Sequence, residues 1–152
     1  VILITLTMII QFESFRKALI VILVIPLSVA GVFILFAITR TSLSFPALIG
    51  VLALFGIVVK NSILVVDKIT QNIKIGMPYD EAITDGASSR LEAIGLTSIA
   101  AILGLVPITI SDPLWRGVGG AIIAGLSFSG IIILFFIPTV YYYFFASEQK
   151  SK

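Results

Sequence analysis

The sequence contains neither cysteine nor histidine, and charged residues make up only 12% of its 152 residues. The absence of cysteine excludes disulfide bonds and thiol chemistry, although it does not fix the compartment. The absence of histidine removes the commonest metal ligand and the commonest general base near neutral pH. A hydrolytic or metal-dependent enzyme is therefore hard to build from the remaining residues, and no cofactor is expected.

The small share of charged residues also argues against a soluble protein. Soluble domains carry about 25% charged residues, about twice the share found here. Hydrophobic residues make up 59% of the chain and fall in long blocks. Blocks of about 18 or more apolar residues can cross a hydrocarbon core of ~30 Å as helix. We therefore predict an all-α integral membrane protein, a bundle of about five transmembrane helices surrounded by the lipid bilayer.

Charged residues, proline and glycine divide the chain into segments. The first apolar run begins at Val1 and covers only about half a bilayer as helix, without the features of a signal peptide, so we expect a truncated helix and a chain that is a fragment. Pro78 followed by acidic residues predicts the start of a short surface helix. The predicted segments are the end of a truncated membrane helix (1–15), membrane helices (18–38, 45–66, 93–110 and 117–145), a cytoplasmic loop with a short surface helix (67–92) and a cytoplasmic tail (146–152).

The distribution of lysine and arginine predicts the orientation in the membrane. Nine of these ten residues lie outside the predicted spans, and seven of the nine fall on one side: Arg16, Lys17, Lys68, Lys74, Arg90, Lys150 and Lys152. Only Arg40 and Arg116 fall on the other side. Basic residues in short loops favour the cytoplasm, so the C-terminus is predicted to be cytoplasmic. The net charge of +2 is small and the basic residues form no cluster, so nucleic acid is not an expected partner.

Lys60 is the most informative residue, because it lies inside a predicted span next to Asn61. A lysine at the centre of a membrane helix costs roughly 2.5–3.5 kcal/mol on insertion scales. One interpretation is a lysine that reaches the membrane surface along its flexible stem. The other is a buried cation paired with a carboxylate, but no acidic residue lies in the four predicted full spans. If Lys60 is functional, its partner must come from a part of the protein that is absent here.

Arg90 and Thr97 form a second, weaker group. They are seven residues apart, so they share a helix face where the predicted span 93–110 enters the membrane. On sequence alone, the default explanation is that Arg90 is a boundary anchor and that the Thr97 hydroxyl is bonded to a nearby carbonyl.

Four blocks of sequence resemble the C-terminal end of resistance–nodulation–division (RND) efflux transporters, in order and with matching spacing. The most specific block surrounds Lys60 and Asn61, and the resemblance covers essentially the whole chain. It is closest to the hydrophobe/amphiphile multidrug branch. The four blocks are Gln11-Phe12-Glu13-Ser14-Phe15, Gly56 to Asp67, Leu96 to Gly104, and Phe136-Ile137-Pro138-Thr139-Val140-Tyr141.

The resemblance implies the eighth to twelfth helices of a twelve-helix pump of the bacterial inner membrane. The resemblance also implies a homotrimer that works with a periplasmic adaptor and an outer-membrane channel. Such a pump exports compounds in exchange for protons. Their proton site is a pair of aspartates on a helix that is absent here. By analogy, Lys60 is the cation paired with those aspartates. Asn61, Thr97 and Arg90 then complete the proton relay or its cytoplasmic entrance.

One departure from the family pattern concerns Arg90. The family usually has Arg-Pro shortly after the first relay arginine, whereas Glu92 and Ala93 stand there in this chain. Two alternatives stay open at this point: an exporter of metal ions, lipids or other substrates from the same superfamily, and a membrane subunit that only packs and assembles. Heavy-metal pumps of the superfamily commonly lack the lysine, so Lys60 favours hydrophobic or amphiphilic substrates.

Overall fold

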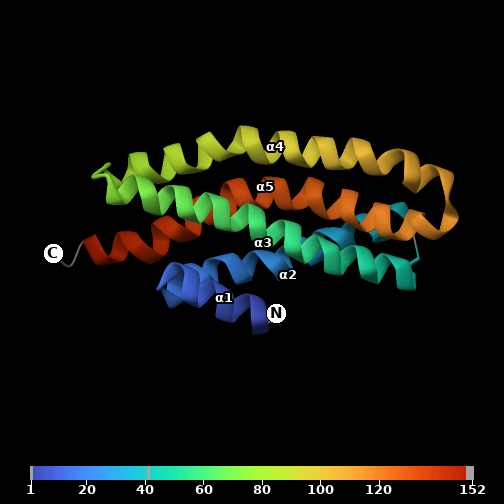
Figure 1. Ribbon diagram of the computed structural model, residues 1–152, viewed down its shortest axis with the longest axis horizontal. Helices are drawn as coiled ribbons and strands as arrows, with labels where there is room; N and C mark the ends of the chain where they lie inside the picture. Colours follow the sequence, from blue (N-terminus) through green and yellow to red (C-terminus); the bar gives the residue numbers. More distant parts are fainter. Residues whose placement is uncertain (1, 41, 150–152) are drawn as a thin grey trace.

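The computed structural model describes residues 2–40 and 42–149, and within these ranges it is helical without a strand. Figure 1 shows an elongated bundle in which the helices run side by side. Its five helices are α1 (Ile2–Phe12), α2 (Phe15–Thr39), α3 (Phe45–Lys74), α4 (Tyr79–Ser111) and α5 (Pro113–Gln149). Helices α2, α3, α4 and α5 are long and apolar enough to cross a membrane, whereas α1 is shorter. The prediction of an all-α membrane bundle is confirmed.

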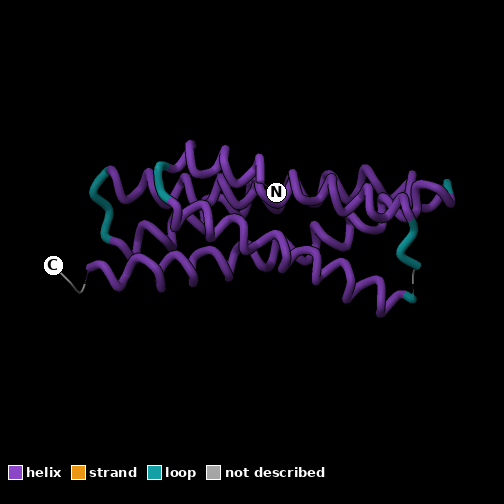
Figure 2. The backbone as a smooth tube through the Cα atoms, turned by 90° about the horizontal axis from the view of Figure 1, so that it is seen from below, coloured by secondary structure: helices purple, strands orange, loops and turns teal. Residues whose placement is uncertain are grey.

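Helix α5 is the central helix of the bundle. It packs against α2, α3 and α4, whereas α1 contacts α2 (Figure 1). Seen from below in Figure 2, the long helices again follow one common axis, with the loops gathered towards the ends. The packed side of α5 buries Leu126, Ile133, Ile137 and Tyr141 almost completely. These side chains form one core with buried residues of α2 and α3.

Helices α3 and α5 approach each other closely at Gly50. A Cβ atom at this position would lie 2.6 Å from the carbonyl oxygen of Val118 and 2.9 Å from Cβ of Ala121. Small residues let membrane helices pack backbone to backbone, which maximises van der Waals contact where no hydrophobic force acts between helices. The sequence therefore uses glycine here for close packing.

The ends of the helices differ from the predicted segments. Helix α3 continues past residue 66 to Lys74, and α4 runs unbroken from Tyr79 to Ser111. The predicted surface helix is thus the first part of α4, separated from α3 by residues 75–78. Asp80 and Glu81 occupy its first turn, where carboxylates are stabilised by the helix dipole. No proline interrupts residues 67–74 or 79–92, so both helices can continue beyond their apolar stretches.

The connection between α3 and α4 turns at Gly76, which has a φ angle of 88°. Glycine adopts this left-handed conformation without the steric cost of a Cβ atom. Near the C-terminus, α5 is helical to Gln149 and so extends into the segment 146–152 predicted as a tail. Residues 150–152 of that predicted tail lie outside the described residues.

Candidate functional site

Lys60 lies at the centre of α3, 15 residues after Phe45 and 14 residues before Lys74. The preceding residues Val58 and Val59 are buried in the bundle, whereas the Lys60 side chain is exposed. A rise of 1.5 Å per residue places Lys60 about 21 Å from the last residue of the helix. The lysine therefore points away from the core of this chain, and it lies about 9 Å before the apolar part of the helix ends near residue 66.

The surface around Lys60 is an open face of α3, which we define by Leu52, Gly56 and Lys60. The three residues follow one another at intervals of four, so they lie on one side of the helix. All three are exposed, and among the described residues no atom beyond the chain neighbours and the surrounding backbone of α3 lies within 4 Å of the place where a Cβ of Gly56 would stand. The open face thus combines apolar surface, a glycine that leaves room for a close neighbour, and one cation.

Asn61 follows Lys60 directly but lies on a buried face of α3, about 100° around the helix from Lys60. Its side chain is only 4% exposed, and the next residue, Ser62, is fully buried and donates a hydrogen bond of 2.8 Å to the carbonyl oxygen of Val58. The structure therefore does not bring the Lys60 and Asn61 side chains together on one surface. Instead, Asn61 brings a polar group into the packed core.

Thr97 lies on the exposed side of α4 and donates a hydrogen bond of 2.8 Å to the carbonyl oxygen of Ala93. The membrane part of α4 is poorly covered by the other helices, with Leu96 70% and Leu103 66% exposed. A threonine hydroxyl that donates one hydrogen bond keeps its lone pairs as acceptors. Thr97 is thus available to accept a hydrogen bond from a group beside α4.

Arg90 lies two turns before Thr97 on α4 and is half-buried. Its Nε atom is buried and has no hydrogen-bond partner among the described residues. Glu92, which stands in the segment that departs from the family pattern, is exposed. The structure therefore places the four predicted site residues on two helices, with Lys60 and Asn61 on α3 and Arg90 and Thr97 on α4.

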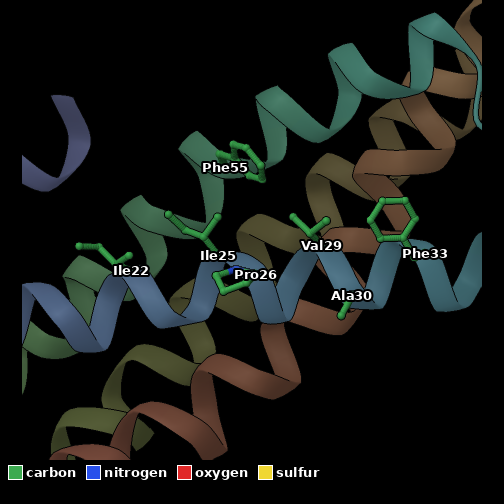
Figure 3. A pocket seen from close by; sticks show the side chains of 7 residues that line it. All are labelled: Ile22, Ile25, Pro26, Val29, Ala30, Phe33 and Phe55. Carbon is green, nitrogen blue, oxygen red and sulfur yellow. The ribbon is translucent and has the colours of Figure 1, made fainter. Parts of the chain in front are cut away.

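A groove of about 470 Å³ opens between α2 and α3. Figure 3 shows its side chains, six of which come from α2 around Pro26, while Phe55 comes from α3. Every one of these residues is apolar, so the groove offers no group for proton transfer. None of the four predicted site residues lines it.

Comparison with known proteins gives the family. The model of the AcrB/AcrD/AcrF family matches residues 1–145. The chain belongs to this family. Membership in the AcrB/AcrD/AcrF family confirms the resemblance to RND efflux transporters, and together with the four apolar helices it shows a multi-pass membrane protein.

Three relatives illustrate the range of the AcrB/AcrD/AcrF family. An uncharacterized transporter of Haemophilus influenzae is 35% identical over 149 residues, which cover 91% of this chain and 14% of the relative. The multidrug resistance protein MdtC of Erwinia amylovora is 35% identical over 132 residues, covering 84% and 13%. The toluene efflux pump membrane transporter TtgB of Pseudomonas putida is 30% identical over 131 residues, covering 84% and 12%. The chain thus spans 12–14% of the length of these relatives.

Sequence reasoning missed a second polar pair in the structure, formed by Asn72 of α3 and Asp85 of α4. One signal was available, because Asn72 follows Asn61 by eleven residues, about three helical turns. Val65 and Ile69 continue the same buried face between them. The partner on α4 could not be found in this way, since it depends on how the two helices pack.

Proposed function

We propose that this chain forms part of the membrane domain of a proton-driven efflux pump that exports hydrophobic or amphiphilic compounds across the bacterial inner membrane. The carrying observation is the exposed Lys60 at the centre of α3. An uncompensated ammonium group facing hydrocarbon is costly, so another part of the full-length protein must cover it. Membership in a family whose relatives are named as multidrug and toluene efflux proteins supports this proposal.

In the proposed mechanism, carboxylates on a helix of the full-length protein pack against the open face of α3. While they are ionised, they hold the Lys60 ammonium in a charge pair, which is strong in a medium of low dielectric constant. Protonation removes the negative charge and frees Lys60 to turn towards neutral acceptors. The two charge states then favour different helix packings, and this difference drives the transport cycle.

Thr97 and Arg90 extend this proposed relay along α4. The Thr97 hydroxyl is exposed and can accept a hydrogen bond from Lys60 after protonation of the carboxylates. Arg90 is half-buried on α4, so the part of its guanidinium that stays exposed offers a donor to the remainder of the transporter. Asn61 contributes through the core, where its buried amide borders Lys60 along the helix.

The proposal includes partners that lie outside this chain. It requires the remainder of the transporter, including the proton-binding aspartates, and it places the C-terminus in the cytoplasm. The whole protein is proposed to act as a homotrimer together with a periplasmic adaptor and an outer-membrane channel.

The test uses the full-length parent protein in cells stripped of their own efflux pumps. We expect it to extrude a lipophilic dye, and a protonophore to abolish this extrusion. Survival in toxic metal salts is measured in parallel, and no protection is expected. Protection against metal salts without dye extrusion would mean that the substrates are metal ions rather than hydrophobic or amphiphilic compounds. A lack of both would favour a membrane subunit that only packs and assembles.

A further inference from the structure

Helices α3 and α4 are joined by one buried polar contact. Asn72 of α3 is only 1% exposed. Its Nδ2 atom donates a hydrogen bond of 2.7 Å to Oδ2 of Asp85 and one of 3.3 Å to the carbonyl oxygen of Ala82, both on α4. We call these three residues the α3–α4 joint. A hydrogen bond to a carboxylate is about twice as strong as one between neutral groups, so this contact has a strong preference for one geometry.

The backbones of α3 and α4 also come close at the joint. A Cβ atom at Gly86 would overlap Cγ1 of Ile69 and lie 3.1 Å from its Cα atom. Glycine at residue 86 therefore lets α4 pack directly on the backbone of α3. Close backbone packing and a buried hydrogen bond together leave the two helices little freedom to slide past each other.

Helix α5 packs against α3 and α4 near the joint. Tyr141 is 1% exposed, and its hydroxyl lies near the side chain of Thr70. Its ring stacks on Phe145 with a centroid distance of 4.6 Å and lies 6.3 Å from the ring of Tyr79. Figure 1 shows that α3 and α4 meet at the end of the bundle where α5 ends. Three helices are therefore fixed to one another at this end.

The position of the joint sets the depth of the proposed relay residues. Lys60 precedes Asn72 by twelve residues, and Thr97 follows Asp85 by twelve residues. Because α3 and α4 run in opposite directions from the joint, both residues lie about 18 Å above it. Asp67 and Arg90 are each five residues from the joint, about 7.5 Å above it. The joint thus matches Lys60 to Thr97, and Asp67 to Arg90, in depth.

We propose that Asn72 and Asp85 are positioning residues that hold α3 and α4 in this register, so that Lys60 and Thr97 stay level during proton transfer. This inference rests on the proposed function. Removing the Asn72 amide leaves the partly buried Asp85 carboxylate without its donor, which favours a shift of α4 relative to α3. A shift by one helical turn, ~5.4 Å, would end the match in depth between Thr97 and Lys60.

The transport experiment uses the full-length parent, purified and reconstituted in proteoliposomes with an imposed pH gradient. Asn72→Leu and Asp85→Leu remove the bond, whereas Asp85→Asn keeps an acceptor for Asn72. Gln71→Leu is the matched control, because Gln71 Nε2 donates a 2.8 Å bond to Asp67 Oδ2 within α3 and joins no second helix. We expect both leucine variants of the joint to lose about tenfold in rate and to shift the pH of half-maximal rate, while Asp85→Asn and Gln71→Leu stay near wild type.

Two outcomes overturn the inference. One is an unchanged rate and pH profile in Asn72→Leu. The other is a loss of rate that follows a loss of thermal stability while the pH profile stays that of wild type, because this result marks a structural role alone.

A second measurement tests the positioning role of the joint independently of transport. Spin labels at Lys74→Cys on α3 and Ala100→Cys on α4, both exposed here, report the distance between the helices in a parent without other cysteines. We expect one narrow distance distribution in the parent and a shifted or broadened one after Asn72→Leu. An unchanged distribution refutes the positioning role. If the wild type pumps nothing while the distribution shifts as expected, the proposed function fails and the joint stands as the element that sets the helix register.

Discussion

Lys60 and Asn61 are neighbours in α3 but lie on different faces of it, since the Lys60 side chain is exposed and the Asn61 side chain is only 4% exposed. The helix therefore carries its cation on the open face and its neutral amide in the core. The described helices of this chain bury Asn61, but they leave the charge uncovered. We propose that the exposed Lys60 forms its charge pair with carboxylates from the remainder of the protein.

The contact between α3 and α5 at Gly50 is expected to be sensitive to a single methyl group. Gly50→Ala places Cβ against the backbone of Val118, so the helices must separate. Overpacking of this kind costs about 1–3 kcal/mol. Thermal unfolding of the purified parent in detergent measures the effect. Gly130→Ala is the control, because its added Cβ would meet no atom of another described helix within 4 Å. Equal melting temperatures for the two variants would contradict the close approach.

The proposed orientation predicts which residues a membrane-impermeant thiol reagent reaches. This chain has no cysteine, so single cysteines can be placed in a parent freed of others. Lys74 at the end of α3 and Ser42 before its start are both exposed. We expect Lys74→Cys to be labelled in inverted membrane vesicles and Ser42→Cys in cells with a permeabilised outer membrane. The opposite pattern would reverse the orientation.

The exposed hydroxyl of Thr97 provides a test of the relay on α4. Thr97→Val keeps the shape of the side chain but removes the acceptor, whereas Thr97→Ser keeps it. We expect dye extrusion to fall about tenfold in Thr97→Val, equivalent to roughly 1.4 kcal/mol in the barrier, and to stay near wild type in Thr97→Ser. Thr139→Val on α5 is the control, since Thr139 is also exposed and donates to a carbonyl of its own helix. Full extrusion by Thr97→Val would remove Thr97 from the relay.

The helices could be predicted from the sequence because the bilayer demands long apolar runs. Their ends could not, because hydropathy marks the membrane boundary rather than the end of a helix. Residues 67–74 and 79–92 are polar yet helical, and α4 crosses the predicted boundary without a break. In these regions tertiary contacts at the α3–α4 joint, rather than apolar length, stabilise the helix.

The candidate site was predictable only where a residue was costly by itself. Lys60 is conspicuous because a charge inside an apolar run needs a partner. The opposite burial of Lys60 and Asn61 depends on which face of α3 packs, and the Asn72–Asp85 bond joins residues thirteen positions apart through helix packing. Such contacts require the register between helices, which a single sequence does not contain.

The central claim is that Lys60 carries the charge that couples proton entry to export. The most direct measurement compares dye extrusion by the full-length parent and its Lys60→Met variant in cells without other efflux pumps, at equal membrane levels and with and without a protonophore. Lys74→Met, which removes an exposed cation at the end of the same helix, is the control. We predict proton-dependent extrusion by the parent and by Lys74→Met, and none by Lys60→Met. Normal extrusion by Lys60→Met would show that Lys60 is only a lysine reaching for the membrane surface, and would contradict the proposed mechanism.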